Sequence, residues 1–417
     1  MFDQSTRSLR SILDHTWVRG LCLVLILYPL LKFGFVQPWA DGYVGFDFEI
    51  FYQAALDIRE GKSPYSDTVF HGDSPPSPDE VAGVYVYPAF FARLLIPLTG
   101  LTPLLAKLVF VALTYGVVLG LLAPSPQSAL EGMGSKGPFW LPVFIPLCFL
   151  FSWGPLIENL RFGQSNLLTL ALFCIAWRIS RSKSLAPRSR GLLAGVLLGM
   201  ASMIKLTPFL ILPFLVISLE WFALAGVAIG VILAVLLSGW HLTWEFFTQI
   251  LPVVSTLESS SRGIDLGSIL ERRFPVPVSG WLVGLFYLAV LALFFRYRRR
   301  ITLGELILLG AYLPTVFTGL WYHHYLLALL PIVVLLPRRI ASLTESLSRD
   351  SLLRPLSLLV MLFLSLLMGF YYWPPVRKIL EGGTGEPLFS ALEIFVIGHV
   401  TVFLILTPQL IGPDERD

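Results

Sequence analysis

The sequence has little charge for its length. Only 14% of its 417 residues are Asp, Glu, Lys or Arg, and 55% are hydrophobic, whereas about a quarter of a soluble domain is charged. The mean hydropathy is +0.75, and the apolar residues come in blocks of about 15–20, separated by short polar or basic pieces. These features exclude one large water-soluble core and predict helices that lie in a lipid bilayer.

Cysteine is also scarce, and the signature of a cleaved signal peptide is absent. The three cysteines, Cys22, Cys148 and Cys174, lie in apolar runs without metal-ligand spacing, so we interpret them as small apolar side chains. The first apolar run, 18–36, is longer than a typical signal-peptide core and follows several arginines. We therefore expect it to be retained as the first span.

The apolar blocks predict a single transmembrane domain over residues 1–417, an all-α polytopic membrane protein with about 12 transmembrane helices. The expected spans are 17–36, 102–123, 138–155, 165–180, 190–204, 206–219, 221–238, 279–296, 301–319, 323–337, 355–372 and 389–408. The segment 86–100 is apolar but short, with Pro88 and Pro97 near its ends. We interpret it as an interfacial or half-crossing helix.

Basic residues predict the orientation in the membrane. Lys and Arg gather in the loops 178–190, 296–300 and 338–354. With twelve spans and a cytoplasmic N-terminus, all three loops lie on the cytoplasmic side, as the positive-inside rule requires. The first external loop, 37–86, and the second long external loop, 239–278, then lie on the opposite face. We therefore expect a multi-pass cell-membrane protein whose active site faces the periplasm or the cell exterior.

The first external loop contains an amphipathic juxtamembrane helix. In FDFEIFYQAALDIREGK, Ile50, Ala54 and Ile58 form an apolar stripe, and such a helix lies on the membrane surface rather than spanning it. Gly61 is the expected stop. Asp47, at its start, has two interpretations: an N-cap, or a general base whose pKa a partly dry boundary tunes.

Polar side chains also interrupt the apolar runs at membrane depth. The segment ENLRFGQSNLL carries Glu158, Arg161, Gln164 and Asn166, which are costly to hold near lipid. They form either a simple turn between two helices, with Gly163 as its break, or a set of hydrogen-bonding groups that face a polar cavity.

A lysine and two histidines also lie within or at the edge of apolar runs. Lys205, between apolar neighbours, either extends to the interface or binds an anionic lipid phosphate. His323 and His324 begin a span, where aromatic-belt packing competes with contact to a phosphate or substrate. Adjacent histidines point about 100° apart on a helix, so a metal site is not expected. Loop 239–278 could shape an acceptor groove, but its charge pattern better fits an ordinary solvated loop.

These segments occur in an order that resembles a known family. The order is D-F-x-x-F-Y-x-A-A, G-K-x-P-Y, Y-x-Y-P, G-Q-S-N-L, K-L-T-P and W-x-H-H-Y, over residues 47 to 325. The chain is similar to the polyprenyl-phosphate-mannose-dependent mannosyltransferases of glycosyltransferase family 87, in the GT-C superfamily. One stretch departs from the family pattern, because GIDLGSILERRF stands where the family commonly has N-Q-S, with Asp265 and Ser268 at that place.

The resemblance implies a GT-C-like bundle, a lipid-linked sugar donor and transfer on the non-cytoplasmic face. It gives Asp47 the place of the catalytic carboxylate, which takes the proton of an acceptor hydroxyl in one inverting displacement. The candidate substrate-binding residues are Glu49, Tyr87, Arg161, Gln164, Asn166, Lys205, Asp265, His323 and His324. Of these, Lys205, Arg161 and one histidine would balance the charge of the leaving phosphate.

The implied partners are a polyprenyl-phosphate-linked sugar, a glycolipid or glycan acceptor and membrane lipid, with mannose as the family default. No metal, cofactor or nucleic acid is expected. Two other classes stay open at this point. A transporter or lipid flippase also uses broken helices and buried polar groups, but the sequence has no internal repeat. A non-catalytic scaffold is the second alternative, but it would have no use for the polar groups that gather on the non-cytoplasmic face.

Overall fold

The computed structural model describes residues 27–28, 30–65, 84–122, 153–256, 266–273, 279–317, 322–335 and 391–411. These parts are helical and contain no strand. The longer helices are α4 (Phe46–Arg59), α7 (Pro103–Leu122), α10 (Trp153–Phe162), α11 (Asn166–Ser180), α12 (Pro187–Ile204), α14 (Trp221–Ser238), α18 (Ser279–Tyr297), α19 (Leu303–Phe317) and α23 (Ala391–Ile411). The predicted all-α class is confirmed for this part of the chain.

Short elements join or extend the longer helices. They are η1 (Leu30–Val36), α3 (Gln37–Asp41), α6 (Ala89–Leu95), η2 (Ile96–Gly100), η4 (Thr207–Ile211), α13 (Leu212–Ile217), α15 (Trp240–Glu245), η5 (Phe246–Ile250), α16 (Leu251–Thr256), α17 (Leu266–Arg273) and η6 (Tyr322–Ala328). The segment 239–278 is thus helical over 240–256 and 266–273, its described residues after Gly239. Trp240 and Trp244 stack there, with ring centroids 5.9 Å apart, and both are exposed.

The membrane character of the chain is clear from three helices in the described part. The segments 103–121, 221–238 and 280–297 are long and apolar enough to cross a bilayer, and a bent pair, 154–162 with 166–180, makes a possible fourth span. The predicted number of about 12 spans stays a prediction, since span 355–372 lies outside the described residues, as does most of 138–155. The helix over 89–100 is too short for a full span.

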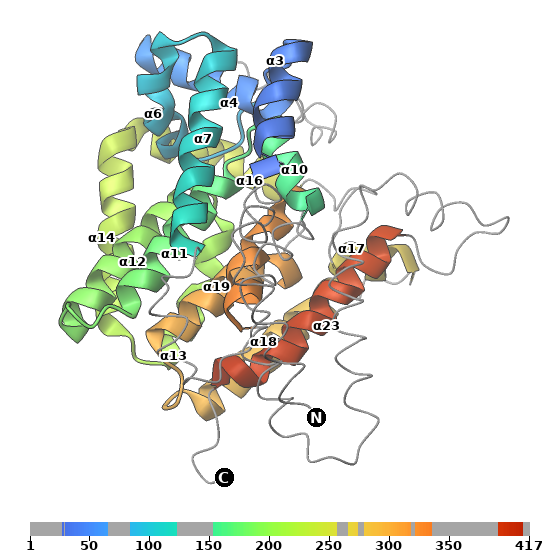
Figure 1. The fold of residues 1–417 in the computed structure, drawn as a ribbon. Helices are drawn as coiled ribbons and strands as arrows, with labels where there is room; N and C mark the ends of the chain where they lie inside the picture. Colours follow the sequence, from blue (N-terminus) through green and yellow to red (C-terminus); the bar gives the residue numbers. More distant parts are fainter. Residues whose placement is uncertain are drawn as a thin grey trace, which may run out of the picture.

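Glycine stripes hold two neighbouring helices close together. Gly195 and Gly199 of α12 face Gly226 and Gly230 of α14, and a Cβ at any of them would strike backbone of the opposite helix. Both pairs have the small-xxx-small spacing of packed membrane helices. Figure 1 shows α12, α14 and α11 on one side of the molecule, with α19 between them and α18 and α23. This arrangement makes a rigid base for the elements above it.

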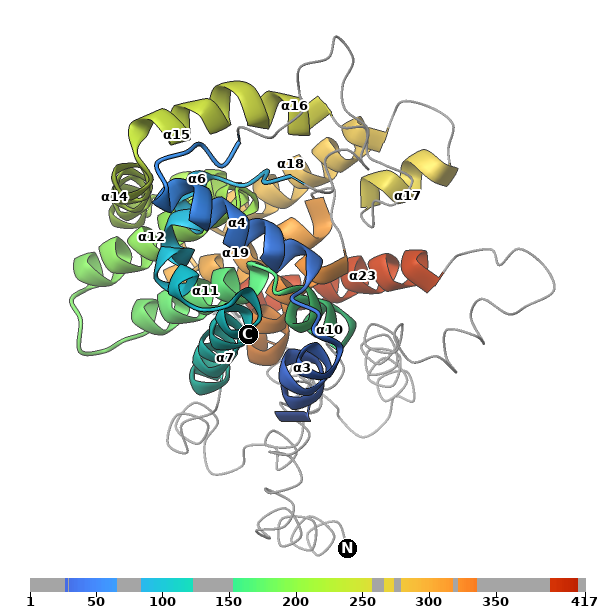
Figure 2. The ribbon, with the colours of Figure 1, turned by 90° about the horizontal axis from the view of Figure 1, so that it is seen from above.

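Helix α4 lies across the top of this base. Viewed from above, it runs over the centre of the molecule close to α6, while α15 and α16 follow one edge (Figure 2). Phe48, Phe51 and Ala55 are buried in the core beneath it, whereas Gln53 is exposed. The helix predicted for this segment is therefore present, and its apolar face packs on the protein. Its place at a membrane surface stays a prediction.

Candidate active site

Two glycines dock the start of α4 onto the bend between α10 and α11. Gly45 has φ +99°, and a Cβ there would lie 2.8 Å from the carbonyl oxygens of Arg161 and Phe162. Gly163 has φ +69°, and its Cβ would lie 2.6 Å from Cβ of Phe48. Only glycine fits such close approaches in the left-handed region. The contact sets Asp47, between Gly45 and Phe48, beside the residues that follow Gly163.

Gly45, rather than Asp47, is the N-cap of α4. The helix begins at Phe46 without a side-chain cap, and the N–H of Phe46 instead donates to the Tyr43 hydroxyl at 3.1 Å. The N-cap interpretation of Asp47 is therefore wrong. The Asp47 carboxylate lies in the first helical turn, where the helix dipole favours negative charge. Because it does not cap the helix, it can interact with other residues or with a ligand.

The α10–α11 bend differs from the predicted turn. Most of the polar segment ENLRFGQSNLL is helical, because α10 continues to Phe162, α11 begins at Asn166 and only 163–165 break the helix. The two helix axes meet at 116°. Gly163, in a left-handed conformation, ends α10 and reverses the chain. The sharp bend brings Gln164 and Asn166 under α4.

Asp47 shares its surroundings with polar residues from five other segments. We name as the Asp47 cluster Asp47, Tyr87, Glu158, Gln164, Asn166, Lys205, His323 and His324. Asp47 is half-buried, and burial raises its pKa above the ordinary 3.8, while His323, the Gln164 amide and Lys205 each act to lower it. The carboxylate is thus held in a partly dry place by nearby positive and hydrogen-bonding groups.

Lys205 ends α12, where the backbone turns to an extended conformation. Its ammonium donates to Oδ1 of Asn166 at 2.9 Å and lies 5.7 Å from the centroid of the Tyr87 ring. The side chain is only 7% exposed, which rules out the alternative that it extends to the interface. Burial opposes the positive charge of this group, whereas the nearby Asp47 carboxylate and the Tyr87 ring favour it.

The two histidines are fixed from the other side of the cluster. The amide of Asn159 donates to the backbone carbonyl of His323 at 2.7 Å, and the amide of Asn166 does so at 3.4 Å. Nδ1 of His323 lies 3.6 Å from a carboxylate oxygen of Glu158. The imidazoles of His323 and His324 meet edge to face, with centroids 4.5 Å apart. The Asn166 side chain therefore bridges Lys205 and the histidine segment.

Several polar atoms here retain hydrogen-bonding capacity. In the described part of the chain, both polar atoms of Gln164, Oδ1 of Asn159 and Nδ1 of His324 are buried and have no hydrogen bond within the usual limits. The Gln164 amide nevertheless lies close enough to Asp47 to favour its ionised form. Buried polar groups are normally paired, so this concentration of unpaired groups suits a ligand with many hydroxyls.

The segment with the G-K-x-P-Y motif is tied to α15, η5 and the stretch before α6. The hydroxyl of Ser63, in the G-K-x-P-Y motif, donates to the Glu245 carboxylate at 2.8 Å, and Tyr65 packs on Phe246 with ring centroids 6.3 Å apart. The Tyr65 hydroxyl donates to the carbonyl of Tyr87 at 2.8 Å. These contacts fix the position of Tyr87, which faces Lys205.

The structure brings together seven of the ten predicted site residues, namely Asp47 and six others. Glu49 is exposed on α4, and Asp265 lies outside the described residues. Arg161 faces a separate pocket with Gln37 and Asp41. Sequence reasoning missed Asn159, whose only signal was its place in the polar segment ENLRFGQSN. It placed Glu158 among groups that could face a polar cavity but did not include it among the substrate-binding residues.

Comparison with known proteins gives one family match. The model of glycosyltransferase family 87 matches residues 85–317, which is more than half of the chain. No curated protein and no solved structure matches. The matched range contains Tyr87, Gln164, Asn166 and Lys205, while Asp47 and the two histidines lie outside it, so their assignment rests on geometry.

Proposed function

The chain belongs to glycosyltransferase family 87, and we propose that it moves a sugar from a polyprenyl-phosphate donor to a lipid or glycan acceptor, with Asp47 as general base. The first candidate sugar is mannose, and the site faces the non-cytoplasmic side. Membership in a glycosyltransferase family favours transfer over the carrier class. The observation that carries the proposal is the half-buried carboxylate of Asp47 beside the buried ammonium of Lys205 and the His323 imidazole.

The proposed reaction is a single displacement. An acceptor hydroxyl oxygen bonds to the anomeric carbon of the sugar, and its proton passes to the Asp47 carboxylate. The bond from the anomeric carbon to the phosphate oxygen breaks, and its electron pair leaves with the polyprenyl phosphate. Because attack and departure occur on opposite faces, the anomeric configuration is inverted.

The cations of the cluster suit the leaving group. The polyprenyl phosphate gains one negative charge as the bond breaks, and it leaves without a proton because a phosphate is a stable anion. Lys205 supplies a positive charge in a place shielded from water, where such a charge stabilises the transition state most. His323, held by Glu158 at 3.6 Å, is placed to donate a hydrogen bond to a phosphate oxygen.

Glu158 and Asn166 act through these groups. Glu158 orients His323, and Asn166 fixes Lys205 at 2.9 Å, so each is a positioning residue in the proposal. The Gln164 amide, beside Asp47, offers a donor and an acceptor to sugar hydroxyls. The Asp47 cluster comes from α4, the stretch before α6, α10, the start of α11, the end of α12 and η6, so the site forms only when the bundle is folded.

The test uses the purified full-length protein in lipid nanodiscs, a short-chain polyprenyl-phosphate mannose as donor and octyl mannoside as acceptor. We expect a disaccharide product whose new bond has the anomeric configuration opposite to that of the donor, as read by NMR. Retention of configuration would refute the single displacement. Movement of the donor across the bilayer without a covalent product would refute transfer and favour a carrier.

A further inference from the structure

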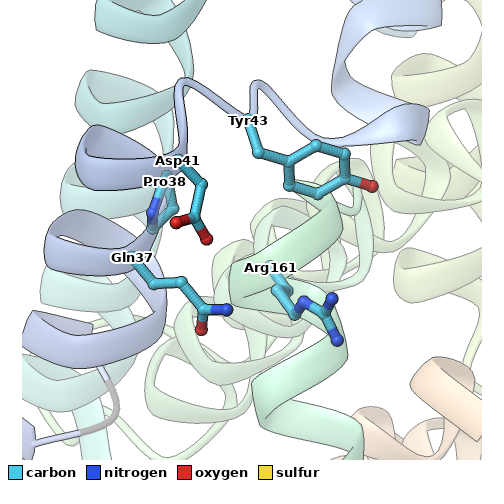
Figure 3. Close-up of a pocket in the computed structure, with 5 residues that line it drawn as sticks. All are labelled: Gln37, Pro38, Asp41, Tyr43 and Arg161. Atoms are coloured by element: carbon cyan, nitrogen blue, oxygen red, sulfur yellow. The ribbon is translucent and has the colours of Figure 1, made fainter.

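We propose that the pocket between α3 and the end of α10 is the acceptor subsite and binds the neutral sugar head of the acceptor. This inference rests on the proposed sugar transfer. The pocket has a volume of about 310 Å³ and is lined by Gln37, Pro38, Asp41, Tyr43 and Arg161. Figure 3 shows Gln37 and Asp41 on α3 facing a space that Arg161 and Tyr43 close from the other side.

The lining has the chemistry of a polyol site. The Asp41 carboxylate accepts hydrogen bonds, the Arg161 guanidinium donates them and the Gln37 amide does both. Sugar hydroxyls also donate and accept, so this lining can pair with them. In the described part of the chain, no hydrogen bond or ion pair joins the side chains of Asp41 and Arg161, although both line the pocket. The Tyr43 ring adds an apolar face against which the C–H groups of a sugar can pack.

The charges of the lining disfavour the donor phosphate. An anionic group would meet the exposed carboxylate of Asp41, which offsets the positive charge of Arg161 in the same lining, and Lys205 and His323 line no part of this pocket. A neutral head group avoids this repulsion. The volume lies at the lower end of the range of about 300–1,000 Å³ for ligand pockets, so it suits one sugar ring rather than an extended oligosaccharide.

The pocket is joined directly to the segment that carries the proposed base. The Tyr43 hydroxyl accepts the N–H of Phe46 at 3.1 Å, and Phe46 precedes Asp47. The backbone of Arg161 touches Gly45, where a Cβ would lie 2.8 Å from the Arg161 carbonyl oxygen. A general base must reach the acceptor hydroxyl, so the acceptor belongs beside α4.

A buried lysine fixes the wall of the pocket. Lys107 of α7 is fully buried, donates to the carbonyl of Arg161 at 2.6 Å and lies 5.5 Å from the centroid of the Tyr43 ring. It therefore holds Arg161 and Tyr43 in place. Helix α3 continues directly from η1, the end of the predicted first span, so a sugar carried on a membrane lipid enters the pocket from the bilayer surface.

The experiment measures protection of an introduced thiol in the full-length protein in nanodiscs. Gln37→Cys places the thiol in the pocket, and Trp39→Cys is the control, since Trp39 is 69% exposed on the same helix. Maleimide labelling rates, corrected for the native cysteines, are measured without ligand and in the presence of each of four compounds. These are octyl mannoside, methyl mannoside, polyprenyl-phosphate mannose, and octyl tetraethylene glycol ether, which has the same tail as octyl mannoside but no sugar.

Octyl mannoside is expected to slow the labelling of Gln37→Cys at least fivefold and to leave the labelling of Trp39→Cys unchanged. In the double variant Gln37→Cys with Asp41→Asn, this protection is expected to be lost. Protection by methyl mannoside as well would support a free glycan as acceptor, and its absence a glycolipid. No protection, equal protection by the ether, or protection only by polyprenyl-phosphate mannose would overturn the proposal. Protection in a protein that transfers no sugar would refute the proposed function and leave the sugar site standing.

Discussion

Gly163→Ala is expected to damage both the stability of the protein and the placement of Asp47. Gly163 has φ +69°, and a Cβ would lie 2.6 Å from Cβ of Phe48. Gly61 is the matched control, because it has φ +77° and nothing within 4 Å of its added Cβ. Gly61→Ala therefore carries the backbone strain of the left-handed region without the collision.

The magnitudes follow from these two geometries. A left-handed conformation costs a non-glycine residue about 1–2 kcal/mol, and this applies to both variants. Ordinary contact begins at 3.4 Å, so relief of the collision at Gly163 requires a movement of about 0.8 Å, and such overpacking costs about 1–3 kcal/mol more. Because Phe48 follows Asp47 directly, the carboxylate moves with it, and a misplacement of about 1 Å costs about 100-fold in rate.

The assay compares unfolding temperature and kcat for the two variants in the same detergent. Gly163→Ala is expected to unfold at a lower temperature than Gly61→Ala and to lose about 10- to 100-fold in kcat, while Gly61→Ala keeps near-normal kcat. If the two variants have the same unfolding temperature and the same kcat, the docking of α4 onto the α10–α11 bend does not position Asp47.

Three further predictions concern the charges around Asp47. Burial raises the pKa of Asp47 above 3.8, so protonation should inactivate the base at a higher pH than it would an exposed aspartate. As pH decreases, kcat/KM should therefore fall above pH 4, and a pH profile that is flat down to pH 4 would contradict this. Lys205→Met removes a group that lowers the pKa of Asp47, so the acid limb of the pH profile should move to higher pH. It also removes a proposed partner of the donor phosphate, so kcat should fall about 10- to 100-fold, and Lys205→Arg should recover part of the lost kcat. Glu158→Gln removes a charge that raises the pKa of Asp47, so the acid limb should move to lower pH; movement in the same direction as in Lys205→Met would refute the assigned arrangement.

Much of the helical framework was predictable from the sequence. The spans 102–123 and 221–238 correspond closely to α7 and α14, because long apolar blocks bounded by polar residues leave few alternatives in a bilayer. The amphipathic helix at 46–59 was predictable for a related reason, since its apolar positions recur at helical spacing and Gly61 ends it.

The site was predictable only in part, because it depends on contacts between segments far apart in the chain. The sequence identified Lys205 and the two histidines from their places in or beside apolar runs, which is a local property. Asp47 was identified from its place at the start of the amphipathic helix and from the family resemblance. The sequence did not reveal that Gly45 caps α4, since the φ of +99° follows from the close approach of α10. Arg161, predicted beside the phosphate, instead lines the pocket next to α3, because the helical course of α10 decides which way it points.

The most direct test of the central claim is the transfer rate of Asp47→Asn. The matched control is Asp57→Asn, since Asp57 lies on the same helix and accepts a hydrogen bond from Gln53 at 3.0 Å, away from the cluster. Asp47→Asn should lose about 10²- to 10⁴-fold in kcat and unfold at the same or a higher temperature, because burial disfavours the ionised carboxylate, while Asp57→Asn should transfer at the normal rate. Near-normal transfer by folded Asp47→Asn would contradict the account.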